Sequence, residues 1–160
     1  MLENTLIIFT SDNGGATYTR AADNSPYIGG KMSNFEGGTI VPMMIEWPKK
    51  IKPQANYSKM VSLLDIVPTI LDAVESPSLN NTFDGVSLLP YINSNGKVPH
   101  KELFWKTGYV KSVISENFKL HINEKEKFLF REFSSTHAQL YTSRTFVNFI
   151  NMMYELRTSY

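Results

Sequence analysis

The sequence contains no cysteine among its 160 residues. Disulfide bonds and thiolate metal sites are therefore excluded, although the absence of cysteine says little about the compartment. No apolar run approaches the roughly 20 residues that a membrane-spanning helix needs. The segment Met1–Asn4 also lacks the basic and long apolar regions of a signal peptide. We therefore expect no membrane partner for this chain.

The sequence has little net charge, because 16 basic residues are balanced by 15 acidic ones. A protein that binds nucleic acid through its phosphates needs a basic excess, so we expect no nucleic-acid partner. Hydrophobic residues make up 42% of the chain and charged residues 19%, as in ordinary globular domains. A chain of this length can bury a core of its own.

A short apolar run, Leu6–Phe9, leads directly into the segment Thr10–Gly15, which reads T-S-D-N-G-G. A strand there would present Asp12 and Asn13 at its carboxyl end, where open α/β sheets place their sites. A carboxylate and a carboxamide oxygen suit a hard cation such as calcium or magnesium. The alternative is an Asx-turn that simply ends the strand.

Residues 14–38 are rich in glycine, serine, asparagine and threonine and predict a long loop. Loops of this length are uncommon in compact domains unless they are functional. Lys31 stands between two glycine pairs, which allow the backbone to approach a ligand closely. The alternative is an ordinary solvated lysine. Four other polar residues of the loop could bind the hydroxyl groups of a sugar substrate or merely face solvent: Tyr18, Arg20, Asp23 and Asn24.

Four more segments follow in order along the chain. They are G-G-K-x-x-x-x-E-G-G at 29–38, V-P-x-x-I-x-W-P at 41–48, D-x-x-P-T at 65–69 and D-G-x-S-L at 84–88. Together with T-S-D-N-G-G, this ordered set resembles the sulfatases, a branch of the alkaline phosphatase superfamily. The resemblance extends from Leu6 to about Leu89, is weaker up to Ile122, and is not clear beyond Glu132.

The resemblance implies an α/β fold with part of an alkaline-phosphatase-like mixed sheet and flanking helices. Residues 1–100 would form the C-terminal part of a sulfatase catalytic domain, and residues 101–141 a small antiparallel subdomain. The status of the tail, residues 142–160, stays open between an amphipathic helix and a departure of the reading frame from the family. The chain then resembles the C-terminal portion of a sulfatase.

The resemblance also implies a reaction, the metal-dependent hydrolysis of aryl or carbohydrate sulfate esters. Asp12 and Asn13 would be metal ligands for Ca²⁺, with Mg²⁺ as the other candidate. Lys31 would be both catalytic and substrate-binding, with its ammonium against the sulfate group. The expected partner is a sulfated small molecule or glycan. Glu36 is expected to have a structural role in the loop.

The family's nucleophile is a formylglycine made within a C/S-x-P-x-R motif, and no such motif occurs in these 160 residues. We therefore expect the missing N-terminal half of the same protein to supply it, and Met1 to be an internal methionine. The isolated chain is expected to lack turnover. Resemblance to exported sulfatases implies a periplasmic or secreted full-length protein.

Two other functions stay open. A related phosphodiesterase or phosphonate hydrolase could use the same strand-tip ligands, although such enzymes more often have D-H than D-N there. The chain could also be a non-catalytic remnant, whose unpaired strand edges would favour aggregation. The three histidines, His100, His121 and His137, lie outside the motifs and are expected to be surface or core residues.

The hydrophobic pattern predicts the secondary structure. Thr5–Thr10 is expected to be a buried, central parallel strand, and Val41–Trp47 a second strand. Residues 62–74 predict a helix whose start is capped by Ser62 and Asp65. Four strands of an antiparallel sheet are expected after residue 102, at 103–105, 109–114, 118–122 and 128–133, with a turn at 115–117.

Overall fold

The structure is a computed structural model that describes residues 2–53, 56–76, 82–94, 97–115, 118–123 and 127–131. It has mixed α/β character and divides into two compact units, each built from two separate segments of the chain. The first unit takes residues 1–14 and 40–103, and the second takes residues 15–39 and 104–160. The domain boundaries predicted from the sequence, at residues 100 and 141, stay predictions.

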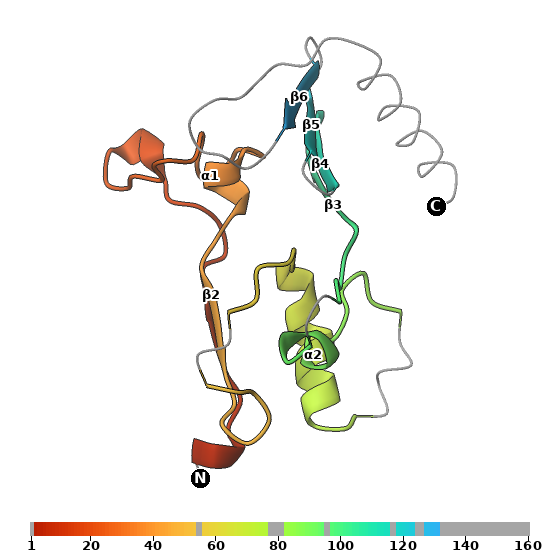
Figure 1. Cartoon of the computed structure of the whole chain (residues 1–160). Coiled ribbons are helices and arrows are strands. Elements are labelled where there is room, and N and C mark those ends of the chain that lie inside the picture. Colours follow the sequence, from red (N-terminus) through yellow and green to blue (C-terminus); the bar gives the residue numbers. More distant parts are fainter. Residues whose placement is uncertain are drawn as a thin grey trace. The chain divides into compact units, whose positions relative to one another are not determined.

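The first unit contains a two-stranded sheet, which Figure 1 shows nearly edge-on at the label β2. Strand β1 (Ile7–Thr10) pairs antiparallel with β2 (Met43–Glu46), with Ile8 opposite Ile45. The prediction of a buried parallel strand at residues 5–10 was therefore wrong for this pair. The long return through residues 11–42 reverses the chain, and side chains alternate between half-buried and exposed. Phe9 is 61% exposed and Met44 60%.

The helical part of the first unit begins where the sequence predicted. A 3₁₀ turn, η3 (Leu63–Asp65), leads into α2 (Ile66–Ala73), and Ser62 and Asp65 form the expected capping box. Ser62 Oγ accepts a hydrogen bond from Leu64 N at 3.2 Å, and Asp65 Oδ2 accepts one from Ser62 N at 2.7 Å. Pro68 lies in the first turn of α2, where its missing N–H is tolerated.

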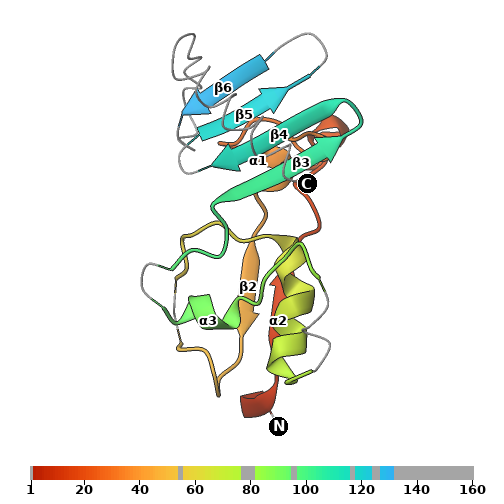
Figure 2. The same cartoon turned by 90° about the vertical axis from the view of Figure 1, so that its right-hand side faces the viewer.

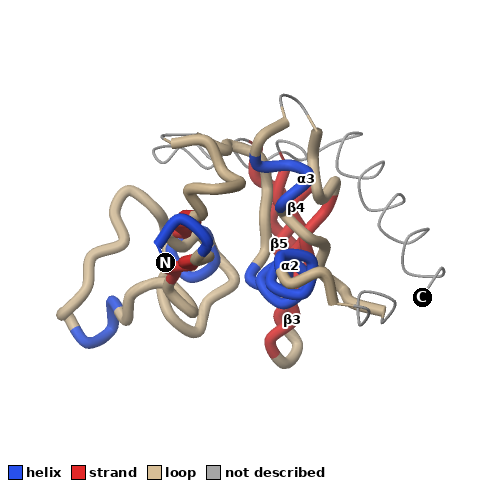
Figure 3. Tube along the Cα trace, turned by 90° about the horizontal axis from the view of Figure 1, so that it is seen from below, coloured by secondary structure: helices blue, strands red, loops and turns tan. Residues whose placement is uncertain are grey.

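Helix α2 contacts η3 and the short helix α3 (Leu89–Ile92), and Figure 3 shows α2 and α3 as blue tubes. Thr69 joins them, since its Oγ1 donates to Asp65 O at 2.6 Å and accepts from Leu88 N at 2.9 Å. Leu88 is only 2% exposed and packs in the core of this unit. A further 3₁₀ turn, η1 (Leu2–Asn4), precedes β1.

The fully buried carboxylate of Asp65 joins three segments of the first unit. Besides Ser62 N, it accepts Val86 N at 2.9 Å on Oδ1. It also accepts His100 Nε2 at 2.8 Å on Oδ1 and 2.9 Å on Oδ2. Because buried charge needs partners, these bonds make the start of α2 the anchor for residues far along the chain.

The second unit contains a four-stranded sheet of order β3–β4–β5–β6, which Figure 2 shows edge to edge. Its strands are β3 (Glu102–Thr107), β4 (Val110–Ser115), β5 (Phe118–Ile122) and β6 (Lys127–Arg131). The pairs β4–β5 and β5–β6 are antiparallel, with Ser112 opposite His121. The predicted C-terminal antiparallel sheet is thereby confirmed.

The remaining predictions for this part of the chain fall outside the described residues. Residues 116 and 117, in the expected turn, are among them, and so are His137 and the whole tail, 142–160. The second unit also holds a 3₁₀ turn, η2 (Thr17–Thr19), and the short helix α1 (Glu36–Thr39). In the part of the chain that is described, no helix has the length and apolarity needed to cross a membrane.

Candidate functional site

Asp12 and Asn13 follow β1 directly and their side chains are joined. Asn13 Nδ2 donates a short hydrogen bond to Asp12 Oδ2. The turn is fixed on either side, since Ser11 Oγ donates to Asn13 O at 2.8 Å and Thr10 Oγ1 to Pro42 O at 3.0 Å. Asp12 is exposed and Asn13 half-buried. The strand end therefore brings the two predicted metal ligands together on a backbone of defined shape.

These two residues fit a hard cation in the chemistry of their donors. Because the Asn13 amide nitrogen bonds Asp12 Oδ2, the Oδ1 atoms of both residues stay available for a ligand within the described chain. One carboxylate and one carbonyl oxygen are suitable ligands for calcium, which needs six to eight oxygens in total. Within the described residues no cluster of three or more acidic or histidine side chains could hold a metal. Further ligands would have to come from elsewhere.

Asn24 organises the loop that carries Lys31. Its Oδ1 accepts Gly15 N at 3.0 Å, and its Nδ2 donates to Gly15 O at 2.9 Å and Gly29 O at 3.0 Å. The sequence left Asn24 as a candidate substrate-binding residue, but its side-chain oxygen and nitrogen both form hydrogen bonds to the backbone. Asn24 is therefore a structural tie, and we refer to residues 24–38 as the lysine loop.

Lys31 is exposed, and its position is set by the backbone on both sides. Its N–H donates to Gly15 O at 3.1 Å, Gly29 adopts a φ of +84° and Met32 a φ of +73°. A non-glycine residue at positive φ is uncommon and is held there by surrounding structure. Lys31 thus occupies the tip of a constrained turn, with its ammonium in reach of a solute anion.

The second glycine pair, Gly37 and Gly38, allows the start of α1 to pack closely against the backbone of residues 28–33 within the lysine loop. A Cβ on Gly37 would lie 2.3 Å from Gly29 O, and one on Gly38 would lie 2.2 Å from Ser33 O. Only glycine fits such contacts with backbone. The glycines therefore allow the close approach of two backbone segments.

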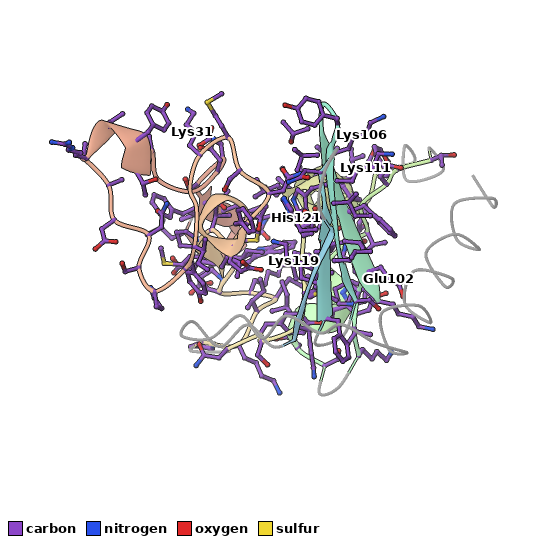
Figure 4. The ribbon with its side chains drawn as sticks, turned by 90° about the horizontal axis from the view of Figure 1, so that it is seen from above. Lys31, Glu102, Lys106, Lys111, Lys119 and His121 are labelled. Atoms are coloured by element: carbon purple, nitrogen blue, oxygen red, sulfur yellow. The ribbon has the colours of Figure 1, made fainter. Side chains whose placement is uncertain are left out.

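Glu36, for which the sequence predicts a structural role, forms an ion pair with a buried lysine. Its Oε1 lies 3.2 Å from Lys119 Nζ on β5, and Lys119 is 2% exposed. Figure 4 shows Lys119 and His121 between α1 and the strands, with Lys106 and Lys111 on the opposite side. The sequence signal for this polar pair was the alternation in Phe118-Lys119-Leu120-His121, because it puts Lys119 and His121 on one face of a strand.

Of the described histidines, His121 is buried and His100 is half-buried. His100 bonds Asp65, and His121 is 5% exposed with its Nδ1 2.7 Å from Ser112 Oγ. His121 also stacks on Phe35, with ring centroids 4.5 Å apart. Burial lowers the pKa of His121, the charge of Lys119 lowers it further, and Glu36 opposes both.

We expect this lowered pKa to make stability depend on pH below 6.5, the ordinary histidine value. Below pH 6.5 the imidazole of His121 is protonated in the unfolded chain but stays neutral in the folded one. The free energy of unfolding therefore falls as the pH drops from 6.5 to the pKa of folded His121. Urea unfolding near neutrality and about one pH unit below 6.5 measures the slope. His121→Phe should have a shallower slope, whereas Tyr109→Phe, at an exposed site, should keep it. Equal slopes in wild type and His121→Phe would contradict the assignment.

The predicted site residues are distributed over both units. Asp12 and Asn13 belong to the first unit, and Lys31 belongs to the second. Each part is held by hydrogen bonds of its own. The sequence also missed Asp65 as a buried junction, although the D-x-x-P-T segment marked its position.

Comparison with known proteins gives a consistent result. The family model described as Sulfatase matches residues 1–76. A protein named uncharacterized sulfatase YdeN from Escherichia coli is 40% identical over 117 residues, which are 72% of this chain and 21% of that protein. Human arylsulfatase A is 36% identical over 115 residues, 71% of this chain and 22% of that protein. The chain thus spans about a fifth of the length of these relatives.

Solved structures share the fold. One from Bacteroides thetaiotaomicron, the 6S-sulf protein of a glycosaminoglycan-metabolism locus, matches with a TM-score of 0.76 at 19% identity, over 99% of this chain and 39% of that one. A second, BT4656 in complex with its substrate D-glucosamine-2-N,6-O-disulfate, matches with a TM-score of 0.61 at 22% identity, over 81% and 28%. The chain belongs to the sulfatase family of the alkaline phosphatase superfamily, as a part of a sulfatase.

Proposed function

We propose that this chain supplies part of the active site of a sulfuric ester hydrolase. Asp12 and Asn13 are the proposed ligands of a divalent cation, and Lys31 is the proposed contact to the sulfate group of the substrate. The family match over residues 1–76 carries the proposal, because this one segment contains all three residues. The constrained turns at residues 11–13 and 29–32 support it, since preorganised groups stabilise a transition state best.

In this proposal Lys31 stabilises negative charge on the sulfuryl group electrostatically. Sulfuryl transfer moves negative charge onto the oxygens around sulfur and onto the leaving alcohol. A compact ammonium on the fixed turn, with three donors, matches a tetrahedral oxyanion. Since the Lys31 N–H is already engaged by Gly15 O, the side chain and not the amide is the proposed contact.

Calcium is typical of the sulfatase family, and magnesium is the other proposed cation. When bound, such an ion supplies Lewis-acid polarisation and lowers the pKa of a coordinated nucleophile. Asp12 and Asn13 would hold it through their Oδ1 atoms. No C/S-x-P-x-R motif occurs in residues 1–160, so the nucleophile of the proposed reaction comes from outside them. We accordingly expect no turnover by these residues alone.

The proposed substrate is an aryl or carbohydrate sulfate ester. Relatives bear names of both kinds, such as human arylsulfatase A and N-acetylgalactosamine-6-sulfatase from the dog. The fold neighbour BT4656 was solved with a disulfated glucosamine. We favour a sulfated sugar or small aromatic ester over a phosphate ester, because Asn13 stands where phosphate enzymes of the superfamily more often have histidine. A periplasmic or secreted location of the whole protein is part of the proposal.

Binding of a sulfate ester to the 160-residue chain tests the proposal. In NMR spectra of ¹⁵N-labelled protein with excess calcium, 4-methylumbelliferyl sulfate should shift the Lys31 amide signal. The expected Kd is about 1 mM or weaker. Lys31→Ala should weaken binding about tenfold or more, because it removes the charged contact. Lys49→Ala, an exposed lysine in the turn after β2, is the matched control and should bind normally.

Two further measurements distinguish the sulfatase function from the phosphate-ester and non-catalytic alternatives. Preference for the corresponding phosphate ester over the sulfate would favour the phosphodiesterase or phosphonate hydrolase function. Asp12→Asn should weaken calcium binding measured by calorimetry, whereas Asp23→Asn, an exposed loop carboxylate bonded to Ser25 N at 2.8 Å, should not. If neither sulfate ester nor calcium binds to the folded wild type, the chain is a non-catalytic remnant and the proposal is wrong.

A further inference from the structure

The C-terminal end of the lysine loop is attached to the four-stranded sheet by three consecutive residues. The first, Asn34, is 5% exposed. Its Oδ1 accepts Thr107 Oγ1 at 3.0 Å, and its Nδ2 lies 3.5 Å from Val110 O. Asn34 therefore links the loop to the end of β3 and the start of β4.

The second residue, Phe35, packs on an imidazole of β5. Its ring is stacked on His121, with the planes 14° apart. His121 is held in turn by Ser112, its cross-strand partner on β4. Because side chains alternate along a strand, Ser112 and His121 lie on the same face of the sheet as Lys119.

The third residue, Glu36, pairs with Lys119, whose side chain is 2% exposed. Lys119 Nζ lies 5.7 Å from the centre of the Trp105 ring, and it has no partner with hydrogen-bond geometry among the described residues. Burial lowers the pKa of Lys119, and Glu36 opposes this shift. A buried ammonium is costly, and an apolar residue of similar size often stabilises a fold as well or better. Its presence here calls for a role in placing the loop.

We propose that Lys119 and His121 are positioning residues for Lys31, and that the C-terminal sheet serves to hold the lysine loop in its active shape. The inference rests on the proposed function of Lys31 as the sulfate contact. Neither residue touches the substrate in this proposal: Lys119 acts through Glu36, and His121 acts through Phe35.

The short distance along the chain from Glu36 to Lys31 makes the coupling direct. Gly30 N donates to Ser33 Oγ at 3.1 Å, and Gly37 N donates to Ile28 O at 2.8 Å, so the loop is closed on itself between these residues. A shift of Phe35 or Glu36 therefore displaces the backbone of Gly29–Met32 as well. Displacements of about 1 Å can cost two orders of magnitude in a catalytic rate.

Amide hydrogen exchange of the full 160-residue chain gives the first test. In Lys119→Met, the amides of Ser33, Gly37 and Gly38 should exchange about tenfold faster or more, while the β4–β5 amides keep wild-type rates. Lys119→Arg should restore protection by renewing the pair with Glu36. Lys111→Met, an exposed lysine on the other face, is the control and should change nothing.

Two results would overturn the inference. One is unchanged exchange at residues 33–38 in folded Lys119→Met, and the other is an equal acceleration of loop and strand amides, which indicates general destabilisation. If Lys119→Met does not fold, Glu36→Gln provides the same comparison, because it removes the charge with little change of volume. It should accelerate exchange of the loop alone.

Sulfate binding gives the second test and separates this inference from the proposed function. With inorganic sulfate as the probe, Lys119→Met should raise the Kd reported by the Lys31 amide about tenfold, and Lys119→Arg should return it. Equal affinity in wild type and Lys119→Met would overturn the positioning role. If wild type binds no sulfate, the proposed function fails, and the exchange experiment alone decides whether the sheet holds the loop.

Discussion

Asp65→Ala is expected to destabilise the first unit by about 3–5 kcal/mol, the largest effect of any single change that we predict. The carboxylate is fully buried and accepts Ser62 N, Val86 N and His100 Nε2. Removing it leaves two backbone donors and one imidazole without an acceptor in the core. It also removes half of the capping box that starts the α2 region. Urea unfolding followed by circular dichroism measures the loss.

Asp65→Asn refines this prediction. The amide keeps the volume but has one oxygen, and its NH₂ group must face either Ser62 N–H or Val86 N–H. A cost of about 1–3 kcal/mol follows from the one unsatisfied donor. Asp72→Asn is the matched control on α2, since its partner Ser87 carries a hydroxyl that can turn to accept. Equal stabilities of the two asparagine variants would contradict the role assigned to Asp65.

Gly38→Ala is expected to displace the lysine loop. The new Cβ would lie 2.2 Å from Ser33 O and 2.5 Å from Gly30 O, and both atoms belong to the loop backbone. Overpacking of this kind costs about 1–3 kcal/mol, and the loop must move to relieve it. The sulfate-induced shift of the Lys31 amide should then be lost.

Gly108→Ala is the control for this prediction. Its Cβ would meet no atom within 4 Å, but the φ of +59° makes alanine unfavourable there by about 1–2 kcal/mol. The two variants should therefore lose comparable stability, while only Gly38→Ala changes Lys31. Normal sulfate shifts in folded Gly38→Ala would show that close packing at Gly38 does not set the position of Lys31.

The sequence revealed those features that depend on local pattern. Ser62 and Asp65 were predicted as a capping pair because the spacing of the two residues alone defines that motif. The strands after residue 102 were found because their alternation is clear. The direction of β1 was missed, because an apolar run identifies a strand but not its neighbour. The structure pairs β1 antiparallel with β2, and the sequence pattern of β1 holds no sign of which strand lies beside it or in which direction.

The site shows the same division. Asp12, Asn13 and Lys31 came from short motifs, and their roles as ligands and contact stay predictions. Lys119 could not be assigned from sequence, because its meaning depends on Glu36, which lies 83 positions earlier in the chain. Asn24 was left ambiguous for a similar reason, since a loop amide gives no sign of which backbone groups it will bond.

The two units interleave along the chain, and this affects the order in which the protein can fold. The lysine loop, near the start of the sequence, is held by residues such as Val110, which lies 76 positions later. During synthesis the loop must wait until the whole first unit and then β4 and β5 have left the ribosome. Contacts of such long range form slowly, because closing the intervening segment costs entropy first. Of the residues proposed for the site, Asp12 and Asn13 can thus be placed once β2 has been made, whereas the loop of Lys31 is held only after β4 and β5 have been made.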